Sequence, residues 1–377
     1  MTTDNDSSTA SGAASTDQTG AENATLPTII SVDAMGGDQG PAAVVAGVCV
    51  AARKNPDIGF ILSGDQDTLK NLLAQQTGLS QRCEIRHADE VVTMDDKPGQ
   101  VMRYGKNTSM WAAVDAVRSG DATVCVSCGN TGALMAVSMI RLRKLPSINR
   151  PAIACLWPSR NKSGFNIMLD VGADIRADQE DLLQYALMGA SYARNGLDLT
   201  RPRVGLLNVG TEEHKGRAEL KVAHELISKA ADAADFDFVG FVEGSDIPSD
   251  RVDVIVTDGF TGNVALKTGE GTASLISDFM RQSFSATPFT RIAALLSLSS
   301  LKRLKRRIDP RRANGGVFLG LNGTVIKSHG SADETGIAAA IQLAITLSKS
   351  DFNHKLAARV ASASLTLQTG QTDKVDN

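Results

Sequence analysis

The feature of this 377-residue chain that most constrains its fold is a recurring unit of β-branched run, glycine-containing polar turn and helical pattern. The apolar runs lie at 28–32, 123–126, 165–171, 203–209, 252–256 and 323–326. Each run leads into a polar turn such as DAMGGDQGP or SCGNTG, and helical patterns follow, for example from Ala42, from Ala133 and over 181–194. Repeated strand–turn–helix units are typical of parallel sheets covered by helices. The sequence therefore predicts an α/β protein with a mostly parallel sheet in three α/β/α layers.

Composition agrees with this fold and also bears on the location and the binding partners of the protein. The chain is 42% hydrophobic, with 4% aromatic residues and 34 glycines, as suits a buried parallel sheet with many tight turns. Its net charge of −3 gives no sign of nucleic-acid binding. The five cysteines are scattered among apolar residues, which favours reduced thiols and a cytoplasmic location. There is no run of about 18 apolar residues that would predict a membrane span.

The polar ends of the chain set the expected domain limits. Residues 1–26 are rich in Ser, Thr, Ala, Asp and Asn and lack the pattern of a signal peptide. We expect tails over 1–26 and 361–377. A single α/β domain is expected over 27–360, with a helical excursion at 283–312.

The turns that follow the predicted strands are the candidate ligand site, because open α/β sheets bind ligands beyond the carboxyl ends of their strands. Glycine and hydroxyl residues that lead into a helix present free N–H groups, which suit phosphate or a carboxylate. The turns carry Asp33, Gly36, Gly37, Asp38; Ser127, Gly129, Asn130, Thr131, Gly132; Asp170, Gly172; Thr211, Glu212, His214, Lys215; Asp258, Gly259, Thr261, Asn263; and Lys327, Ser328, His329, Ser331. The same residue types are common helix caps, so each turn alone also has a structural explanation. Several such turns in one crevice favour a phosphate site.

Familiar cofactor and nucleophile motifs are absent. The stretch TGNVALKT has Leu266 where a P-loop needs glycine, and GEGTAS at 269–274 only partly matches a dinucleotide motif. Cys125 and Cys128 form one C-x-x-C without a second pair or a nearby histidine, so we interpret both as small buried residues. There is no G-x-S-x-G elbow. We expect no cofactor and no metal.

Motifs spread along nearly the whole chain resemble one family. DAMGGD (33–38), SCGNTGALMA (127–136), LDVGAD (169–174), LLNVGTEEHKG (206–216), VTDGFTGNVALKTGEG (256–271) and LGLNGTVIKSHGSAD (319–333) are similar to the PlsX phosphate acyltransferases. The likeness runs from about Thr28 to Ser348, and Cys128 is the departure that we notice. The resemblance implies a fold like that of isocitrate and isopropylmalate dehydrogenases and of phosphotransacetylase. It also implies a homodimer that associates peripherally with the membrane.

The activity implied by the resemblance is reversible transfer of a long fatty acyl group from acyl carrier protein to inorganic phosphate. The product, acyl phosphate, feeds phospholipid synthesis. Phosphate can attack the thioester directly, so we expect no acyl-enzyme. Substrate binding is assigned to Asp33, Gly36, Gly37, Ser127, Gly129, Asn130, Thr131, Gly132, Thr261, Asn263, Ser328 and Ser331. The catalytic candidates are Lys215, His329, Asp258 and His214, whereas Lys267 is interpreted as a solvent-exposed lysine.

The excursion at 283–312 has an amphipathic pattern. Ile292, Leu295, Leu298, Leu301, Leu304 and Ile308 recur every three or four residues, the spacing of one helical face. Basic residues crowd its end: Lys302, Arg303, Lys305, Arg306, Arg307, Arg311 and Arg312. Leucines beside a basic cluster favour contact with an anionic membrane surface, through Leu295, Leu298, Leu301, Lys302 and Arg303. The leucines alone also suit a core or dimer contact, and the basic cluster alone also suits docking of an acidic carrier protein.

Three other functions compete with this interpretation. A phosphotransacetylase-like enzyme would use an acyl-CoA and share the phosphate site. A decarboxylating dehydrogenase would need a metal-binding Asp cluster and an adenosine site, and we find neither. A non-catalytic scaffold would have no need for several glycine–hydroxyl turns around one crevice.

Overall fold

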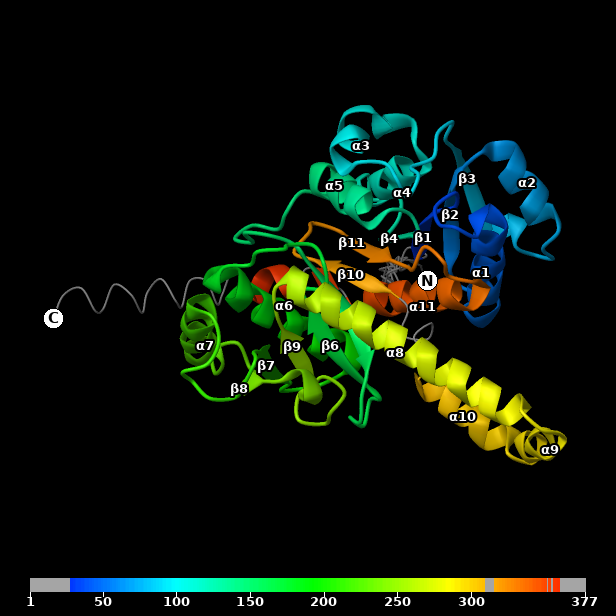
Figure 1. Ribbon diagram of the computed structural model, residues 1–377. Helices are drawn as coiled ribbons and strands as arrows, with labels where there is room; N and C mark the ends of the chain where they lie inside the picture. The colour runs from blue at the N-terminus through cyan, green and yellow to red at the C-terminus, as the bar shows by residue number, and fades with distance from the viewer. Residues whose placement is uncertain (1–27, 309–314, 351, 354, 360–377) are drawn as a thin grey trace, which may run out of the picture.

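The fold is built on one continuous sheet that runs through the molecule (Figure 1). The structure is a computed structural model that describes residues 28–308, 315–350, 352–353 and 355–359. Its 11 strands are ordered β3-β2-β1-β4-β11-β10-β5-β6-β9-β7-β8. The predicted tails at 1–26 and 361–377, and Arg311 and Arg312 of the basic cluster, lie outside the described residues.

Most strands and helices alternate along the chain. The strands are β1 (Ile29–Asp33), β2 (Gly59–Gly64), β3 (Cys83–His87), β4 (Val124–Ser127), β5 (Ala152–Pro158), β6 (Phe165–Leu169), β7 (Arg203–Leu207), β8 (Asp237–Val242), β9 (Val254–Val256), β10 (Gly316–Leu319) and β11 (Thr324–Lys327). The helices are α1 (Gly40–Lys54), α2 (Gln66–Ala74), α3 (Pro98–Tyr104), α4 (Ser109–Arg118), α5 (Thr131–Arg141), α6 (Gln179–Leu197), α7 (Ala218–Ala230), α8 (Gly259–Ser285), α9 (Pro288–Leu296), α10 (Leu298–Ile308) and α11 (Glu334–Lys349).

Side-chain alternation along the strands builds the three predicted layers. In β4, Val124 and Val126 belong to one apolar cluster and Cys125 to another, as expected for a strand buried on both faces. The first cluster includes apolar residues of α1, α2, α6, α7 and α11, and the second includes those of α4 and α5. The predicted α/β class and the mostly parallel sheet are confirmed.

The sheet consists of two parallel halves that run in opposite directions. Strands β3, β2, β1, β4 and β11 pair in parallel, and so do β6, β9, β7 and β8. Between the halves lie three antiparallel pairings, β11 with β10, β10 with β5, and β5 with β6. Three reversals leave β6 antiparallel to β11. The turns after β1, β4 and β11 therefore lie at one end of the sheet, and those after β6, β7 and β9 at the other.

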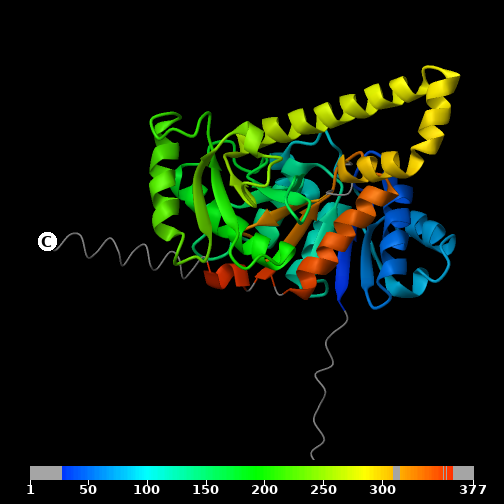
Figure 2. The same cartoon turned by 90° about the horizontal axis from the view of Figure 1, so that it is seen from below.

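Helix α8 crosses between these two ends. It begins directly after β9 and projects beyond the body of the molecule, where α9 and α10 turn back (Figures 1 and 2). Near its start, Gly262 packs so closely on the turn after β6 that an added Cβ would lie 1.9 Å from the carbonyl oxygen of Asp170. Only glycine permits that approach, which fixes the path of α8 over the sheet.

The predicted amphipathic stripe is divided between two helices. Ile292 and Leu295 lie on α9, whereas Leu298, Leu301 and Leu304 lie on α10, with Ser297 between the two helices. Thr287 begins α9 with a capping box, because its hydroxyl accepts from the N–H of Thr290 at 3.2 Å. Residue 283, the predicted start of the excursion, lies near the end of α8, and the apolar residues of the stripe are divided between the two helices that follow.

Candidate active site

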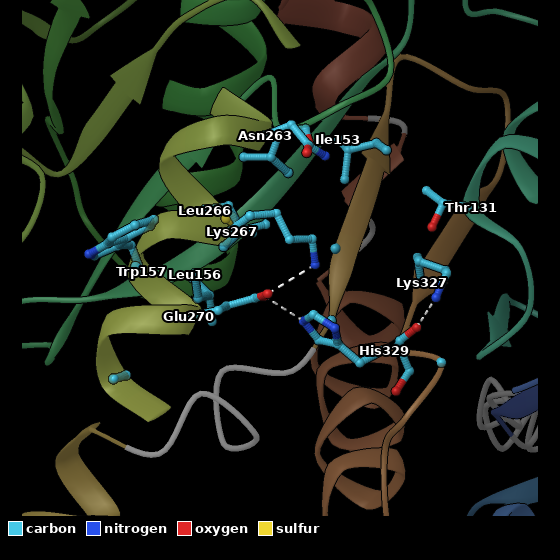
Figure 3. Close-up of a pocket in the computed structure, with 18 of the residues that line it drawn as sticks. Thr131, Ile153, Leu156, Trp157, Asn263, Leu266, Lys267, Glu270, Lys327 and His329 are labelled. Carbon is cyan, nitrogen blue, oxygen red and sulfur yellow. Dashed lines mark hydrogen bonds and ion pairs between the residues drawn. The ribbon is translucent and has the colours of Figure 1, made fainter. Parts of the chain in front are cut away.

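A pocket of about 400 Å³ lies between α8 and the centre of the sheet (Figure 3). One part of its wall is apolar and includes Ile153, Leu156, Trp157, Val171 and Leu266. The other part is polar and includes Thr131, Asn263, Lys267, Glu270, Lys327, Ser328 and His329. An apolar chain and an anionic group fit such a pocket together.

Strand pairing brings the polar ends of β1, β4 and β11 to the same level. Asp33 is opposite Ser127, and Ser127 is opposite Lys327. The buried Asp33 carboxylate accepts hydrogen bonds from the hydroxyls of Ser109 and Ser127, both at 2.7 Å. Burial raises the pKa of Asp33, although these hydrogen bonds act in the opposite direction. Asp33 and Ser127 thus organise the turn behind the pocket and do not line it.

Lys327 is a partly buried amine at the end of β11. Its Nζ lies 3.4 Å from the carbonyl oxygen of Cys128 and also donates to that of Ser328. Burial lowers the pKa of Lys327 to about 8, and the neighbouring Lys267 acts in the same direction. The amine is therefore a cation at neutral pH that loses its proton only slightly above it.

The turn after β4 presents the start of α5 to the pocket. Asn130 caps the helix by accepting from the N–H of Ala133 at 3.0 Å. Its Nδ2 donates to the carbonyl oxygens of Met94 at 2.8 Å and Asp96 at 3.1 Å. Asn130 thus ties the 94–96 segment to the start of α5, while Thr131, the first residue of the helix, lines the pocket.

The start of α8 is held by a separate set of contacts. Asp258 caps the helix by accepting from the N–H of Thr261 at 2.8 Å, and Arg217 pairs with the same carboxylate. Asn263 donates to the carbonyl oxygen of Val171 at 3.1 Å. Asp258 and Thr261 therefore position the helix, and Asn263 is the residue of this turn that reaches the pocket.

Glu270 links α8 to the loop that follows β11. One carboxylate oxygen accepts from Lys267 Nζ at 2.9 Å, and the other lies 2.9 Å from Nε2 of His329 (Figure 3). Burial alone would raise the pKa of Glu270, but the contacts with His329 and Lys267 outweigh it and hold this pKa below its usual value. The carboxylate is therefore charged at neutral pH.

The structure divides the residues predicted for the site. Thr131, Asn263, Ser328 and His329 line the pocket. The others that the sequence assigned to the site are not among the lining residues: Asp33, Gly36, Gly37, Ser127, Gly129, Asn130, Gly132, His214, Lys215, Asp258, Thr261 and Ser331. Lys215 pairs with Glu212 at 2.7 Å in the turn after β7, at the opposite end of the sheet from Lys327. The catalytic roles of Lys215 and His214 stay predictions.

Lys267 and Glu270 line the pocket without having been assigned to the site, and Lys327, named among the candidate turns but given no role, also lines it. Lys267 keeps 59% of its side chain exposed, as predicted, but it also faces the pocket and pairs with Glu270. The spacing of Lys267 and Glu270, three residues apart on a helix, is the sequence signal that could have joined them. Within the described part of the chain, no three His, Cys, Asp or Glu side chains are grouped so that they could hold a metal.

The fold is shared with solved phosphotransacetylases. A phosphotransacetylase from Streptococcus pyogenes has a similar structure, with a TM-score of 0.55 and 17% identity over 89% of this chain and 94% of that one. The EutD phosphotransacetylase from Staphylococcus aureus matches with a TM-score of 0.52 and 13% identity, over the same shares of the two chains.

Sequence comparison identifies the family. The model of the family described as "Fatty acid synthesis protein" matches residues 28–355, so the chain belongs to that family. A phosphate acyltransferase from Jannaschia sp. is 72% identical over 342 residues, which is 91% of this chain and 94% of the relative. One from Dinoroseobacter shibae is 70% identical over 355 residues, or 94% and 92% of the two chains. The protein is thus an enzyme of the acyltransferase class.

Proposed function

We propose that the enzyme transfers a long-chain fatty acyl group from acyl carrier protein to inorganic phosphate and so makes acyl phosphate for phospholipid synthesis. The observation that carries this proposal is the two-part pocket, in which an apolar wall at Ile153, Leu156 and Trp157 adjoins the cations of Lys267 and Lys327. The apolar wall suits the acyl chain and the cationic part suits phosphate. Relatives about 70% identical carry the name phosphate acyltransferase, which supports the same reaction.

Phosphate is proposed to bind at the polar end of the pocket. Thr131 offers a hydroxyl at the N-terminus of α5, where helix N–H groups and the helix dipole favour an anion. Lys267 and Lys327 supply positive charge, and Ser328 and His329 lie on the loop after β11. These groups come from three separate elements, so a bound phosphate would be held in a defined orientation.

Direct attack accounts for the reaction with no covalent enzyme intermediate. A phosphate oxygen forms a bond to the thioester carbonyl carbon, and the carbon–sulfur bond then breaks. The proton of hydrogen phosphate passes to the departing thiolate, so acyl phosphate and the free thiol of the carrier are formed. A donor to the developing oxyanion contributes ~3–4 kcal/mol, and alignment of the two substrates contributes roughly 7–11 kcal/mol. His329 is the proposed donor to phosphate, to the oxyanion or to the leaving group.

The direct test is to incubate the protein with palmitoyl-acyl carrier protein and phosphate and to trap acyl phosphate as its hydroxamate. We expect hydroxamate only when phosphate is present, and no acyl group on the denatured enzyme when it is absent. Turnover with acetyl-CoA but not with the carrier protein would favour the phosphotransacetylase alternative, which the similarity of fold supports. No turnover with either substrate would favour a non-catalytic scaffold.

We further propose that the enzyme is a cytoplasmic homodimer that binds anionic membranes through α9 and α10. Among the described helices, none is both long and apolar enough to cross a bilayer. Phe289 and Leu296 of α9 keep 85% and 84% of their surface exposed, and Lys302 and Arg303 of α10 are also exposed. Exposed apolar residues next to cations suit an anionic lipid surface. Exposed apolar residues on α8, among them Leu275 and Phe279, support the dimer.

A further inference from the structure

Glu270 presents a problem for a pocket that is proposed to bind phosphate. Its side chain is 22% exposed and lines the same pocket, and its carboxylate carries a charge that repels the substrate. A glutamate kept there only for solubility would extend into solvent. Instead, one oxygen of Glu270 accepts from the ammonium of Lys267 and the other contacts the imidazole of His329, both at 2.9 Å.

The two partners of Glu270 come from different walls of the pocket. Lys267 precedes it by one helical turn on α8, whereas His329 lies 59 positions further along the chain, beyond β11. Their side chains are 59% and 42% exposed, so neither is fixed by packing alone. A flexible lysine and a partly exposed imidazole lose rotational freedom when one carboxylate holds both.

We propose that Glu270 is a positioning residue for the phosphate site: its carboxylate holds the ammonium of Lys267 and the imidazole of His329 where both contact phosphate. This inference rests on the proposed function, since it assigns phosphate to that end of the pocket. Glu270 takes no part in bond making. Its charge repels the substrate to some extent, but it also holds two donors in place before phosphate binds. This lowers the entropic cost of ordering those side chains on binding.

The charge of Glu270 and its positioning role have opposite effects on phosphate affinity, so the direction of the change in affinity distinguishes them. Binding of inorganic phosphate is measured by calorimetry for the wild type and for Glu270→Gln, which keeps the shape and removes the charge. Coulomb repulsion alone predicts tighter binding to the variant. The positioning role predicts binding about tenfold weaker, the size of a lost charge-assisted hydrogen bond. Asp278→Asn, an exposed carboxylate further along α8, is the matched control and should bind phosphate like the wild type.

A second set of variants separates positioning from a purely structural role, in which Glu270 only ties α8 to the loop after β11. Glu270→Asp keeps the charge and should recover part of the phosphate affinity. In a His329→Ala background, Glu270→Gln should have a smaller effect on kcat than in the wild type, because the two residues act as one unit. A purely structural role predicts that Glu270→Gln lowers the melting temperature and leaves the phosphate affinity unchanged. Equal or tighter phosphate binding by Glu270→Gln, or none by the wild type, overturns the inference. Phosphate binding without any acyl phosphate formation overturns the proposed function alone.

Discussion

At the scale of single residues, burial of Lys327 predicts a pH dependence for the proposed binding of phosphate. Its pKa is lowered to about 8 by burial, so the amine is charged below that pH and neutral above it. We expect the KM for phosphate to rise roughly tenfold between one pH unit below and one above this pKa, as the charged fraction falls by that factor. Steady-state kinetics with phosphate as the varied substrate measure the change.

Two variants make the assignment to Lys327 specific. Lys327→Met should raise the KM for phosphate below pH 8, where the wild-type amine is charged, and remove most of the rise above pH 8. Lys349→Met removes an exposed lysine at the end of α11 and should keep the wild-type profile. If the wild-type KM does not change across this range, the Lys327 amine does not bind phosphate.

The residues of the site were only partly predictable from the sequence. Thr131, Asn263, Ser328 and His329 were found because glycine–hydroxyl turns after strands have a local signature. Glu270 was missed because no local sequence pattern indicates that a glutamate in a helix contacts a histidine 59 residues away. That contact depends on how α8 crosses the sheet, which is decided by packing between distant segments.

At the scale of elements, the projecting pair α9 and α10 carries the proposed membrane contact. Phe289, Leu295 and Leu296 are the most exposed apolar residues of α9. Burying one such side chain is worth about 1.5–3 kcal/mol, so replacing all three with Asp should lower the partition onto anionic vesicles more than 100-fold. Co-sedimentation with vesicles that contain phosphatidylglycerol measures this partition.

The matched control removes apolar surface elsewhere. Ile175→Asp combined with Val222→Asp changes two exposed residues of the main body, and it should leave vesicle binding intact. Loss of binding in this control, or unchanged binding of the α9 variant, would refute membrane contact through α9.

Elements were predicted better than their arrangement. The β-branched runs marked β1, β4, β6, β7, β9 and β11 because each is apolar and ends in a turn. Strands β2, β3, β5, β8 and β10 were not predicted, and two of them, β5 and β10, reverse the direction of the sheet. Strand direction depends on long-range pairing, which local periodicity does not encode. The turns expected in one crevice are therefore divided between two ends of the sheet.

At the scale of the whole molecule, α8 joins the parts that function requires. Its start is fixed near the turns after β6 and β9, its first half forms a wall of the pocket, and its end carries the projection (Figures 1 and 2). The residues Asn263, Leu266, Lys267 and Glu270 face the pocket. A shift of this one helix would thus change the pocket and the orientation of α9 and α10 together.

The other side of α8 provides the test of the proposed dimer. Phe260, Val264, Leu275, Ile276 and Phe279 are 48–61% exposed, and none of them lines the pocket. A row of exposed apolar residues along one helix is typical of a surface that is covered in the assembled protein.

We expect sedimentation equilibrium to give twice the 39.7 kDa chain mass for the wild type. Leu275→Glu combined with Phe279→Glu should give monomers, because the dimer interface would then bury carboxylates that have no partner. Val222→Glu, at an exposed position of α7, should stay dimeric. The double variant keeps Phe289, Leu295 and Leu296, so its monomers should still bind anionic vesicles, although more weakly because each particle has one projection instead of two. A monomeric wild type at micromolar concentration would refute the dimer, and a dimeric double variant would show that another surface forms it.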